Sequence, residues 1–340
     1  MATVSATCSG RRISKARAVS RPRSYSACPN PTALLTRSKG RLRMQSLRKM
    51  ASRARMKTRV AMFGNNHSFK VNLKYAAYEN TARRSWKPES NPTPEQLAAA
   101  ERFKTNGFEV LPPPRGMTPE KLRAIKEAVD KRFEQQSNGF SLGVGMSRLI
   151  DGLEVMPEIV DFIDADLEAV VENYYGSHFK IFAISFYRTL PTPDKPDSSF
   201  LWHLDNCPKQ EIKLMIYLDD VVADTGAFSV KDKPFSQDLR KEGFFDRKRI
   251  NQFIDRLSDT STTKVLEGPT GSRLLFENGG CIHKATSPKR EHRDVVTFVL
   301  IPSDIPWRPH FARHRNLLST NGGICVDPFR DRPEHVGYQY

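Results

Sequence analysis

The chain has 340 residues and a formal net charge of +16. Such a basic protein suggests nucleic-acid binding, but the charge is uneven: residues 1–78 hold 18 Lys and Arg and no Asp or Glu, which leaves 36 basic and 38 acidic side chains in the other 262 residues. This near-neutral remainder argues against a nucleic-acid-binding body and is long enough for one sizeable hydrophobic core.

The first 65 residues are rich in Arg, Ser and Ala and contain no acidic residue. This composition is typical of an organelle transit peptide, and the lack of a long apolar run argues against a secretory signal or a membrane span. We therefore expect residues 1–65 to be a disordered targeting segment, for a plastid rather than a mitochondrion, and residues 66–92 to be a linker. The alternative is a basic arm that binds nucleic acid.

The cysteines form no recognisable pattern. Cys8 and Cys28 lie in the basic leader, and Cys207, Cys281 and Cys325 remain, with no CxxC pair. This odd set argues against both a disulfide framework and a zinc ribbon.

Three helices are predicted before residue 178. The first begins at Thr93, where Pro94 and Gln96 complete a capping box, and it ends at Gly107. The segment "FEVLPPP" that follows is typical of a short strand ended by prolines. Further helices are predicted over residues 117–136, capped by Thr118, and as one continuous element over residues 156–176, which ends in Gly.

Strands dominate after residue 178. The segments "HFKIFAISFYRTLP", "IKLMIYLDDVVADTGAFSV", "TKVLEG", "SRLLFENGG" and "RDVVTFVLIP" are rich in β-branched and aromatic residues, and "DTG" divides the second into two strands joined by a turn. Helices followed by strands predict an α+β, mainly β, fold with an antiparallel core closed as a barrel or double sheet. We expect this domain over residues 93–310, with a helical lid insertion at 235–260 and a C-terminal extension at 311–340.

His203 and Asp205 lie two residues apart at the mouth of an apolar run. Alternate residues of a strand point the same way, so the two side chains are either ligands of one metal or polar residues at a strand end. His283 follows 80 residues after His203, and Arg293 ten residues after His283. Two imidazoles and one carboxylate form the facial triad of non-haem Fe(II) oxygenases, and the planar fork of Arg suits the far carboxylate of a co-substrate.

The motifs "NGFEVLPP", "WHLD", "KLMIYLDDVVADTGAFSV" and "LLFENGGCIHKA", with the strand at Arg293, resemble the phytanoyl-CoA dioxygenase-like family of Fe(II)/2-oxoglutarate oxygenases over residues 95–305. The resemblance implies a double-stranded β-helix, or cupin-like jelly roll, with flanking N-terminal helices. It also implies that His203, Asp205 and His283 bind the metal. Arg293 would hold 2-oxoglutarate, with Arg290 as the alternative anchor.

The resemblance further implies a dioxygenase that uses Fe(II), 2-oxoglutarate and O2, with ascorbate helping to keep the iron reduced. It would oxidise an unactivated C–H bond of a small metabolite by hydroxylation, desaturation or ring closure, with no nucleic-acid partner. The rival prediction is a non-catalytic jelly-roll binding protein with a basic nucleic-acid-binding arm.

Two polar side chains lie within the apolar run "IKLMIYL". Tyr217 shares one face of the predicted strand with Lys213 and Met215, so its hydroxyl is a candidate contact for 2-oxoglutarate. Lys213, the one charge in the run, is either a residue at the rim of the cavity or the partner of a carboxylate.

Overall fold

The computed structural model describes residues 69–88, 91–135, 140–141, 145–149, 151–192, 198–257 and 261–320, and single residues at 50, 51, 54, 55, 58 and 62. The chain divides into two units, Met1–Arg53 and Ala54–Tyr340, and the elements below belong to the second. The predicted targeting segment lies almost entirely outside the described residues, as do residues 321–340 of the predicted extension. Within the described part, no helix combines the length and apolar character needed to cross a membrane.

The first predicted helix is confirmed with its caps. The helix α3 (Pro94–Asn106) begins at Thr93, whose hydroxyl accepts from the Gln96 amide, while the Gln96 side chain accepts from the Thr93 amide. It ends at Gly107, whose φ of 78° is the left-handed conformation that glycine adopts without a steric penalty. Strand β1 (Phe108–Leu111) and helix α4 (Pro119–Gln135) follow where the sequence predicts them.

The prediction of one helix over residues 156–176 is wrong in one respect. The chain forms a short helix α5 (Gly152–Val155), a 3-10 turn (Pro157–Phe162) and then helix α6 (Ala165–Tyr175). The break falls at Asp164, whose carboxylate accepts from the Leu167 amide at 2.9 Å and also pairs with Arg273 at 2.6 Å. Asp164 therefore starts a new helix and fixes it to a distant strand.

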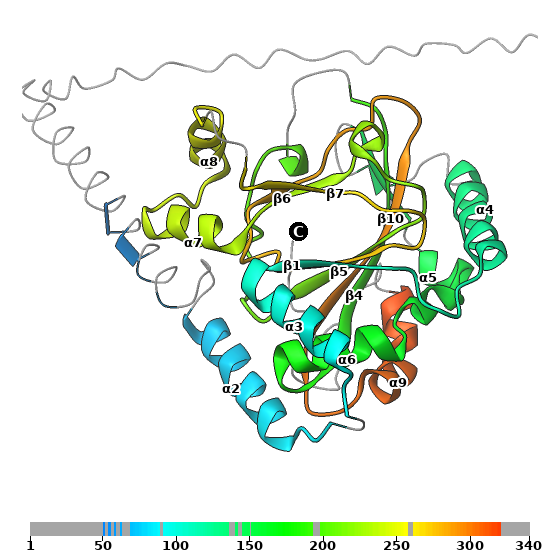
Figure 1. Cartoon of the computed structure of the whole chain (residues 1–340), viewed down its shortest axis with the longest axis horizontal. Helices are drawn as coiled ribbons and strands as arrows, with labels where there is room; N and C mark the ends of the chain where they lie inside the picture. The colour runs from blue at the N-terminus through cyan, green and yellow to red at the C-terminus, as the bar shows by residue number, and fades with distance from the viewer. Residues whose placement is uncertain are drawn as a thin grey trace, which may run out of the picture. The chain divides into compact units, whose positions relative to one another are not determined.

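Two antiparallel sheets form the β core (Figure 1). The larger sheet has the order β1-β8-β5-β10-β4-β3-β2 and the smaller the order β7-β6-β9. Their strands are β2 (Phe140–Ser141), β3 (Met146–Leu149), β4 (His178–Thr189), β5 (Ile212–Tyr217), β6 (Phe228–Lys231), β7 (Thr263–Leu266), β8 (Arg273–Phe276), β9 (His283–Lys284) and β10 (Arg293–Ser303).

The path of the chain from β4 onward is that of a jelly roll. A bridge between His203 and His283 adds a further rung beside β9, so the smaller layer reads β7-β6-β9-His203. In the larger layer β8, β5, β10 and β4 adjoin in that order. One winding chain thus contributes four positions to each layer, which is the double-stranded β-helix that the resemblance implies. The predicted fold class is confirmed.

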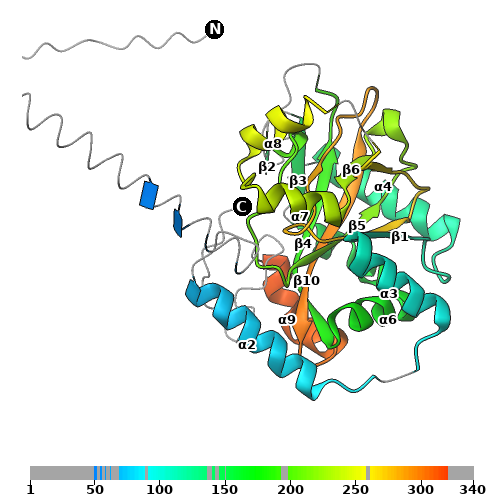
Figure 2. The ribbon, with the colours of Figure 1, turned by 60° about the vertical axis from the view of Figure 1, so that its left-hand side comes forward.

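Alternate residues of the strands face two different hydrophobic clusters. Met215, Tyr217 and Val295 of the larger sheet pack with Phe228 and Val230 of the smaller one, so these side chains fill the space between the sheets. The other face of the larger sheet packs against a second cluster that includes residues of α3, α6 and helix α9 (Trp307–Thr320). Figure 2 shows α3, α6 and α9 gathered on this outer side.

The insertion predicted at 235–260 contains two helices, α7 (Lys233–Lys241) and α8 (Arg247–Ile254). Leu239 and Ile250 of these helices pack with Trp202 and Ile282, the residues next to His203 and His283. In addition, the Asn251 side chain accepts from the Trp202 amide at 3.0 Å and donates to the Trp202 carbonyl at 2.8 Å. The insertion is therefore tied to the outer side of the segments that carry both histidines. Its role as a lid stays a prediction.

The segment expected to be a linker contains helix α2 (Phe69–Ser85). Tyr75 is 1% exposed, belongs to the outer core cluster, and donates from its hydroxyl to Glu211 at 3.1 Å. Ala82 is also fully buried. These contacts show that α2 packs on the domain, although the helix has almost no amphipathic pattern that the sequence would reveal.

Truncation should separate the leader from α2. Removing residues 1–65 is expected to leave the free energy of unfolding unchanged, whereas removing residues 1–92 should lower it by about 2 kcal/mol or more, since burial of a large side chain contributes roughly that amount. Urea denaturation of both truncated proteins and the full chain measures the difference. Equal midpoints for the two truncated proteins would show that α2 contributes nothing.

Candidate metal centre

His203 and His283 lie side by side because their backbones pair. The His203 amide donates to the His283 carbonyl and the His283 amide donates to the His203 carbonyl, both at 2.9 Å. Two residues further on, the Asp205 amide donates to the Asn278 carbonyl at 3.0 Å. The pairing brings two predicted ligands that are 80 residues apart in the sequence onto directly paired backbone positions.

The three side chains predicted to bind a metal converge. Asp205 Oδ1 lies 3.5 Å from His203 Nε2 and 3.8 Å from His283 Nε2, and one potential ligand atom from each residue lies within 4.8 Å of the others. Both histidines are buried, with exposed fractions of 7% and 3%. The geometry is thus that of a compact three-ligand site.

Hydrogen bonds determine which ring nitrogen of each histidine faces the site. His203 Nδ1 lies 2.7 Å from the Leu201 carbonyl, and His283 Nδ1 lies 2.9 Å from the Cys281 carbonyl. Because a carbonyl oxygen only accepts, each Nδ1 carries the proton and donates. In the neutral ring each Nε2 therefore keeps a free lone pair, as a metal ligand requires.

Burial and neighbouring charges bias the protonation of the site toward metal binding. Burial, helped by the nearby His203 ring, lowers the pKa of His283 to about 3. Burial alone would raise the pKa of Asp205, but the neighbouring Lys213 ammonium holds that pKa well below its usual range. At neutral pH His283 is therefore neutral and Asp205 is ionised.

The second carboxylate oxygen of Asp205 faces two other side chains. Lys213 Nζ donates to Oδ2 at 2.6 Å, and Asn278 Nδ2 donates to it at 3.4 Å. Lys213 is thus a carboxylate partner, one of the two roles that the sequence leaves open. Sequence reasoning missed Asn278; its place in the turn "ENGG", five residues before the predicted ligand His283, is the signal that would have pointed to it.

Arg293 lies in the interior of the jelly roll, while Arg290 is exposed. In the strand register Arg293 is opposite Thr189, on the same face of β10 as Val295, which is opposite Tyr217. Its exposed fraction is 2%; one terminal nitrogen donates to the Gly226 carbonyl, the other donates to Thr189 Oγ1 at 3.2 Å, and Nε is buried without a partner. Burial lowers the pKa of this guanidinium.

The Tyr217 hydroxyl already has two backbone partners. It donates to the Leu266 carbonyl at 2.6 Å and accepts from the Phe228 amide at 3.1 Å, and burial raises its pKa to about 12. Its side chain shares the interior face with Lys213 and Met215, as the alternation predicts. These bonds join the two sheets and account for the buried hydroxyl; a contact of Tyr217 with 2-oxoglutarate stays a prediction.

The described residues contain a second group of potential metal ligands, Asp130, His292 and Asp294. Here lysine and arginine already supply the positive charge. Lys126 Nζ lies 2.6 Å from Asp130, 2.9 Å from Asp294 and 3.3 Å from Asp219, and Arg188 pairs with both Asp130 and Asp294. This network explains how α4 is fixed to β10 without a metal.

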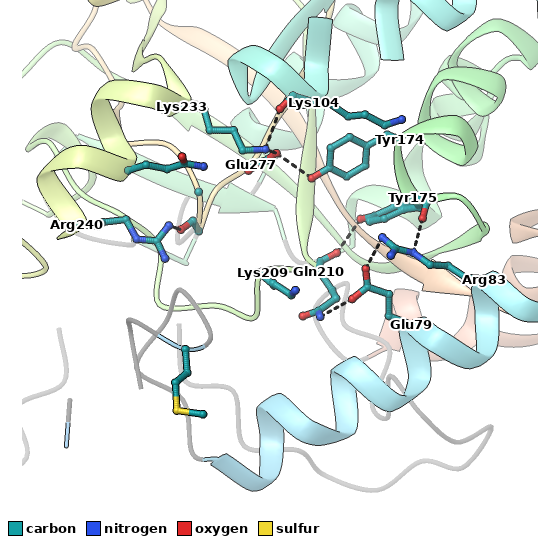
Figure 3. Close-up of a pocket in the computed structure, with 14 residues that line it drawn as sticks. Glu79, Arg83, Lys104, Tyr174, Tyr175, Lys209, Gln210, Lys233, Arg240 and Glu277 are labelled. Carbon is teal, nitrogen blue, oxygen red and sulfur yellow. Dashed lines mark hydrogen bonds and ion pairs between the residues drawn. The ribbon is translucent and has the colours of Figure 1, made fainter. Parts of the chain in front are cut away.

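A pocket of about 500 Å³ lies beside Lys233, Glu277 and Arg240 (Figure 3). Its lining includes Glu277, Gly279 and Gly280, which flank or follow Asn278, but none of the three predicted ligands. Lys233 pairs with Glu277 at 2.5 Å and Arg83 with Glu79 at 2.7 Å within this lining. The pocket is therefore distinct from the candidate metal centre.

No protein-family model and no curated protein matches this sequence. Solved structures that resemble it are iron- and 2-oxoglutarate-dependent oxygenases. The non-heme alpha-ketoglutarate-dependent epimerase SnoN from nogalamycin biosynthesis is 16% identical, with a TM-score of 0.44 over 62% of this chain and 82% of its own. HygX from Streptomyces hygroscopicus, solved with nickel and 2-oxoglutarate, is 18% identical, with a TM-score of 0.45 over 64% of this chain and 89% of its own. EctD from S. alaskensis, solved with Fe, is 16% identical, with a TM-score of 0.44 over 64% of this chain and 79% of its own. At this distance the likeness concerns the fold alone.

Proposed function

We propose that this chain is an Fe(II)- and 2-oxoglutarate-dependent oxygenase of the phytanoyl-CoA dioxygenase-like family that oxidises an unactivated C–H bond of a small metabolite. The observation that carries the proposal is the convergence of His203 Nε2, His283 Nε2 and Asp205 Oδ1, with both histidines buried. Packing does not explain this convergence, because each Nδ1 carries the proton and each Nε2 therefore presents a lone pair, not a donor, toward the Asp205 carboxylate.

The residues present fit a divalent iron. Two imidazole nitrogens and one carboxylate oxygen are the donor set of facial-triad Fe(II) sites, which leave other positions open. The Leu201 and Cys281 carbonyls orient the two rings, and Lys213 and Asn278 hold the oxygen of Asp205 that faces away from the histidines. Iron held by these three residues would supply the activation of O2 and the oxidative decarboxylation of 2-oxoglutarate, with ascorbate keeping the iron reduced.

The surroundings of Arg293 fit the distal carboxylate of 2-oxoglutarate. No carboxylate of the described residues forms an ion pair with this buried guanidinium, and its Nε has no hydrogen-bond partner. A buried unpaired charge is costly, so an anionic ligand that completes its hydrogen bonds would stabilise the protein. Thr189, which already contacts Arg293 at 3.2 Å, would offer the same carboxylate a hydroxyl donor.

Other side chains would shape the reaction by excluding water. Met215, Val295 and Phe228 line the interior between Lys213 and Arg293 with apolar surface, which strengthens the electrostatic interactions of a bound anion. An ionised Asp205 at the ligand position favours hydroxylation, desaturation or ring closure over halogenation, because in related halogenases that position holds a small residue. We further propose that the basic leader directs the chain to a plastid.

An anaerobic titration tests the proposed function. Adding Fe(II) and 2-oxoglutarate together should give a weak visible charge-transfer band, and Fe(II) with succinate should give none, because succinate lacks the keto oxygen that chelates the metal. Exposure to O2 should then yield succinate. In a screen of metabolites, a true substrate should raise succinate formation above the background rate that the protein shows without substrate. A protein that binds neither Fe(II) nor 2-oxoglutarate would be the non-catalytic jelly-roll binding protein instead.

A further inference from the structure

Lys213 places an ammonium group within the candidate metal centre. It lies on the interior face of β5, opposite Val299 of β10, and its Nζ is 2.6 Å from Asp205 Oδ2. The Lys213 side chain is 21% exposed and that of Asp205 is 23% exposed, so water screens this pair only in part. The strand register, and not the flexibility of the side chain, directs the lysine toward the ligand.

This ammonium changes the charge that a metal would meet. Of the three predicted ligands only Asp205 is negative, and Lys213 already balances its charge. The nearby carboxylate of Glu211 points elsewhere, to the Tyr75 hydroxyl at 3.1 Å, while Arg293 adds a second interior cation. A divalent cation would thus enter a region that carries no net negative charge to attract it.

We propose that Lys213 makes metal binding depend on the dianionic co-substrate. This inference rests on the proposed function and concerns how the same site is loaded. In a triad without the lysine, the carboxylate alone would favour the metal; here the ammonium repels the metal until a dianion such as 2-oxoglutarate binds beside it and restores the balance. Two ligands that each improve the site for the other have a coupling free energy, which is reciprocal.

The alternative role for Lys213 is to position Asp205 only, so that Oδ1 faces the histidines. The two roles predict opposite changes when the charge is removed. If the lysine repels the metal, Lys213→Met should bind metal more tightly without 2-oxoglutarate. If the lysine only orients the carboxylate, the same variant should bind metal more weakly with and without the co-substrate.

The experiment is a titration of the metal-free full chain with Co(II), a redox-stable substitute for Fe(II), with and without saturating 2-oxoglutarate, followed by calorimetry. In the wild type, 2-oxoglutarate should lower the Co(II) Kd. In Lys213→Met that enhancement should shrink at least about fivefold, mainly because the Kd without 2-oxoglutarate falls. The effect of Co(II) on the 2-oxoglutarate Kd should shrink by the same factor.

Two further variants keep the test decisive. Lys213→Gln can still donate to Asp205 but carries no charge, so it should behave like Lys213→Met, and it replaces that variant if the latter does not fold. Lys233→Met removes a lysine of similar exposure whose 2.5 Å partner is Glu277, outside the triad, and should keep the wild-type enhancement.

An unchanged enhancement in both Lys213 variants, or weaker Co(II) binding in both conditions, would overturn the inference. Absence of any Co(II) binding that depends on His283 would instead overturn the proposed function.

Discussion

Replacing His283 with alanine is expected to abolish succinate formation and to weaken Fe(II) or Co(II) binding by more than about 100-fold. Loss of a partner outside the ligand set already costs 10- to 100-fold in comparable sites, so loss of a ligand should cost at least as much. His203→Ala should have the same effect, because the two rings occupy paired positions with ring centroids 4.4 Å apart. Calorimetric metal titration and a succinate assay measure the two losses.

The second group of potential ligands supplies the control for this prediction. His292→Ala removes the imidazole from the cluster with Asp130 and Asp294, where Lys126 and Arg188 already balance the carboxylates. Metal affinity and succinate formation should therefore stay near wild type. Metal binding that survives in His283→Ala and disappears in His292→Ala would place the metal at the second cluster and exclude the proposed triad.

Replacing Arg293 with glutamine should raise the Kd of 2-oxoglutarate by about 100-fold or more. Charge-assisted hydrogen bonds contribute roughly 1.5–3 kcal/mol each, and about 1.4 kcal/mol corresponds to a factor of ten, so loss of a two-bond contact accounts for this change. Arg293→Lys should recover part of the affinity, because it keeps the charge and loses the planar fork. Titration of the metal-loaded protein with 2-oxoglutarate measures the Kd.

Arg290→Ala is the matched control, since Arg290 lies three residues from Arg293 and is exposed. It should leave the Kd of 2-oxoglutarate near wild type. Metal affinity without co-substrate should also stay near wild type in the Arg293 variants, because Arg293 is not one of the predicted ligands. A large increase in Kd for Arg290→Ala and none for Arg293→Gln would transfer the anchor role to Arg290 while leaving the triad intact.

Much of the local structure could be predicted from the sequence because its causes lie within a few residues. The capping box of α3 joins Thr93 to Gln96, and Gly107 and Gly176 end their helices in the left-handed conformation. The alternation that places Lys213, Met215 and Tyr217 on one face of β5 is likewise local.

Features that depend on contacts between residues far apart in the sequence could not be predicted from the sequence. The break before α6 depends on Asp164 pairing with Arg273, and α2 packs on the domain through Tyr75 and Glu211, although its own sequence is weakly amphipathic. The apolar strand that begins at Arg293 favours it over Arg290 as the anchor, but only the fold shows that Arg293 is buried, that Arg290 is exposed, and that Tyr217 bonds to the opposite sheet.

The sequence by itself determined the donor types of the candidate metal centre, their order along the chain and the class of fold. Only the tertiary structure decided that Lys213 reaches Asp205, that each histidine presents Nε2, and that Arg293 is buried with an unpartnered Nε. The physical reason is that strand register, and the pairing of His203 with His283, bring together side chains that are distant in sequence. Once those side chains are buried, the short distances between their charged and polar groups determine their protonation, because the interior screens charges weakly. The same distances determine the charge that a bound ligand meets.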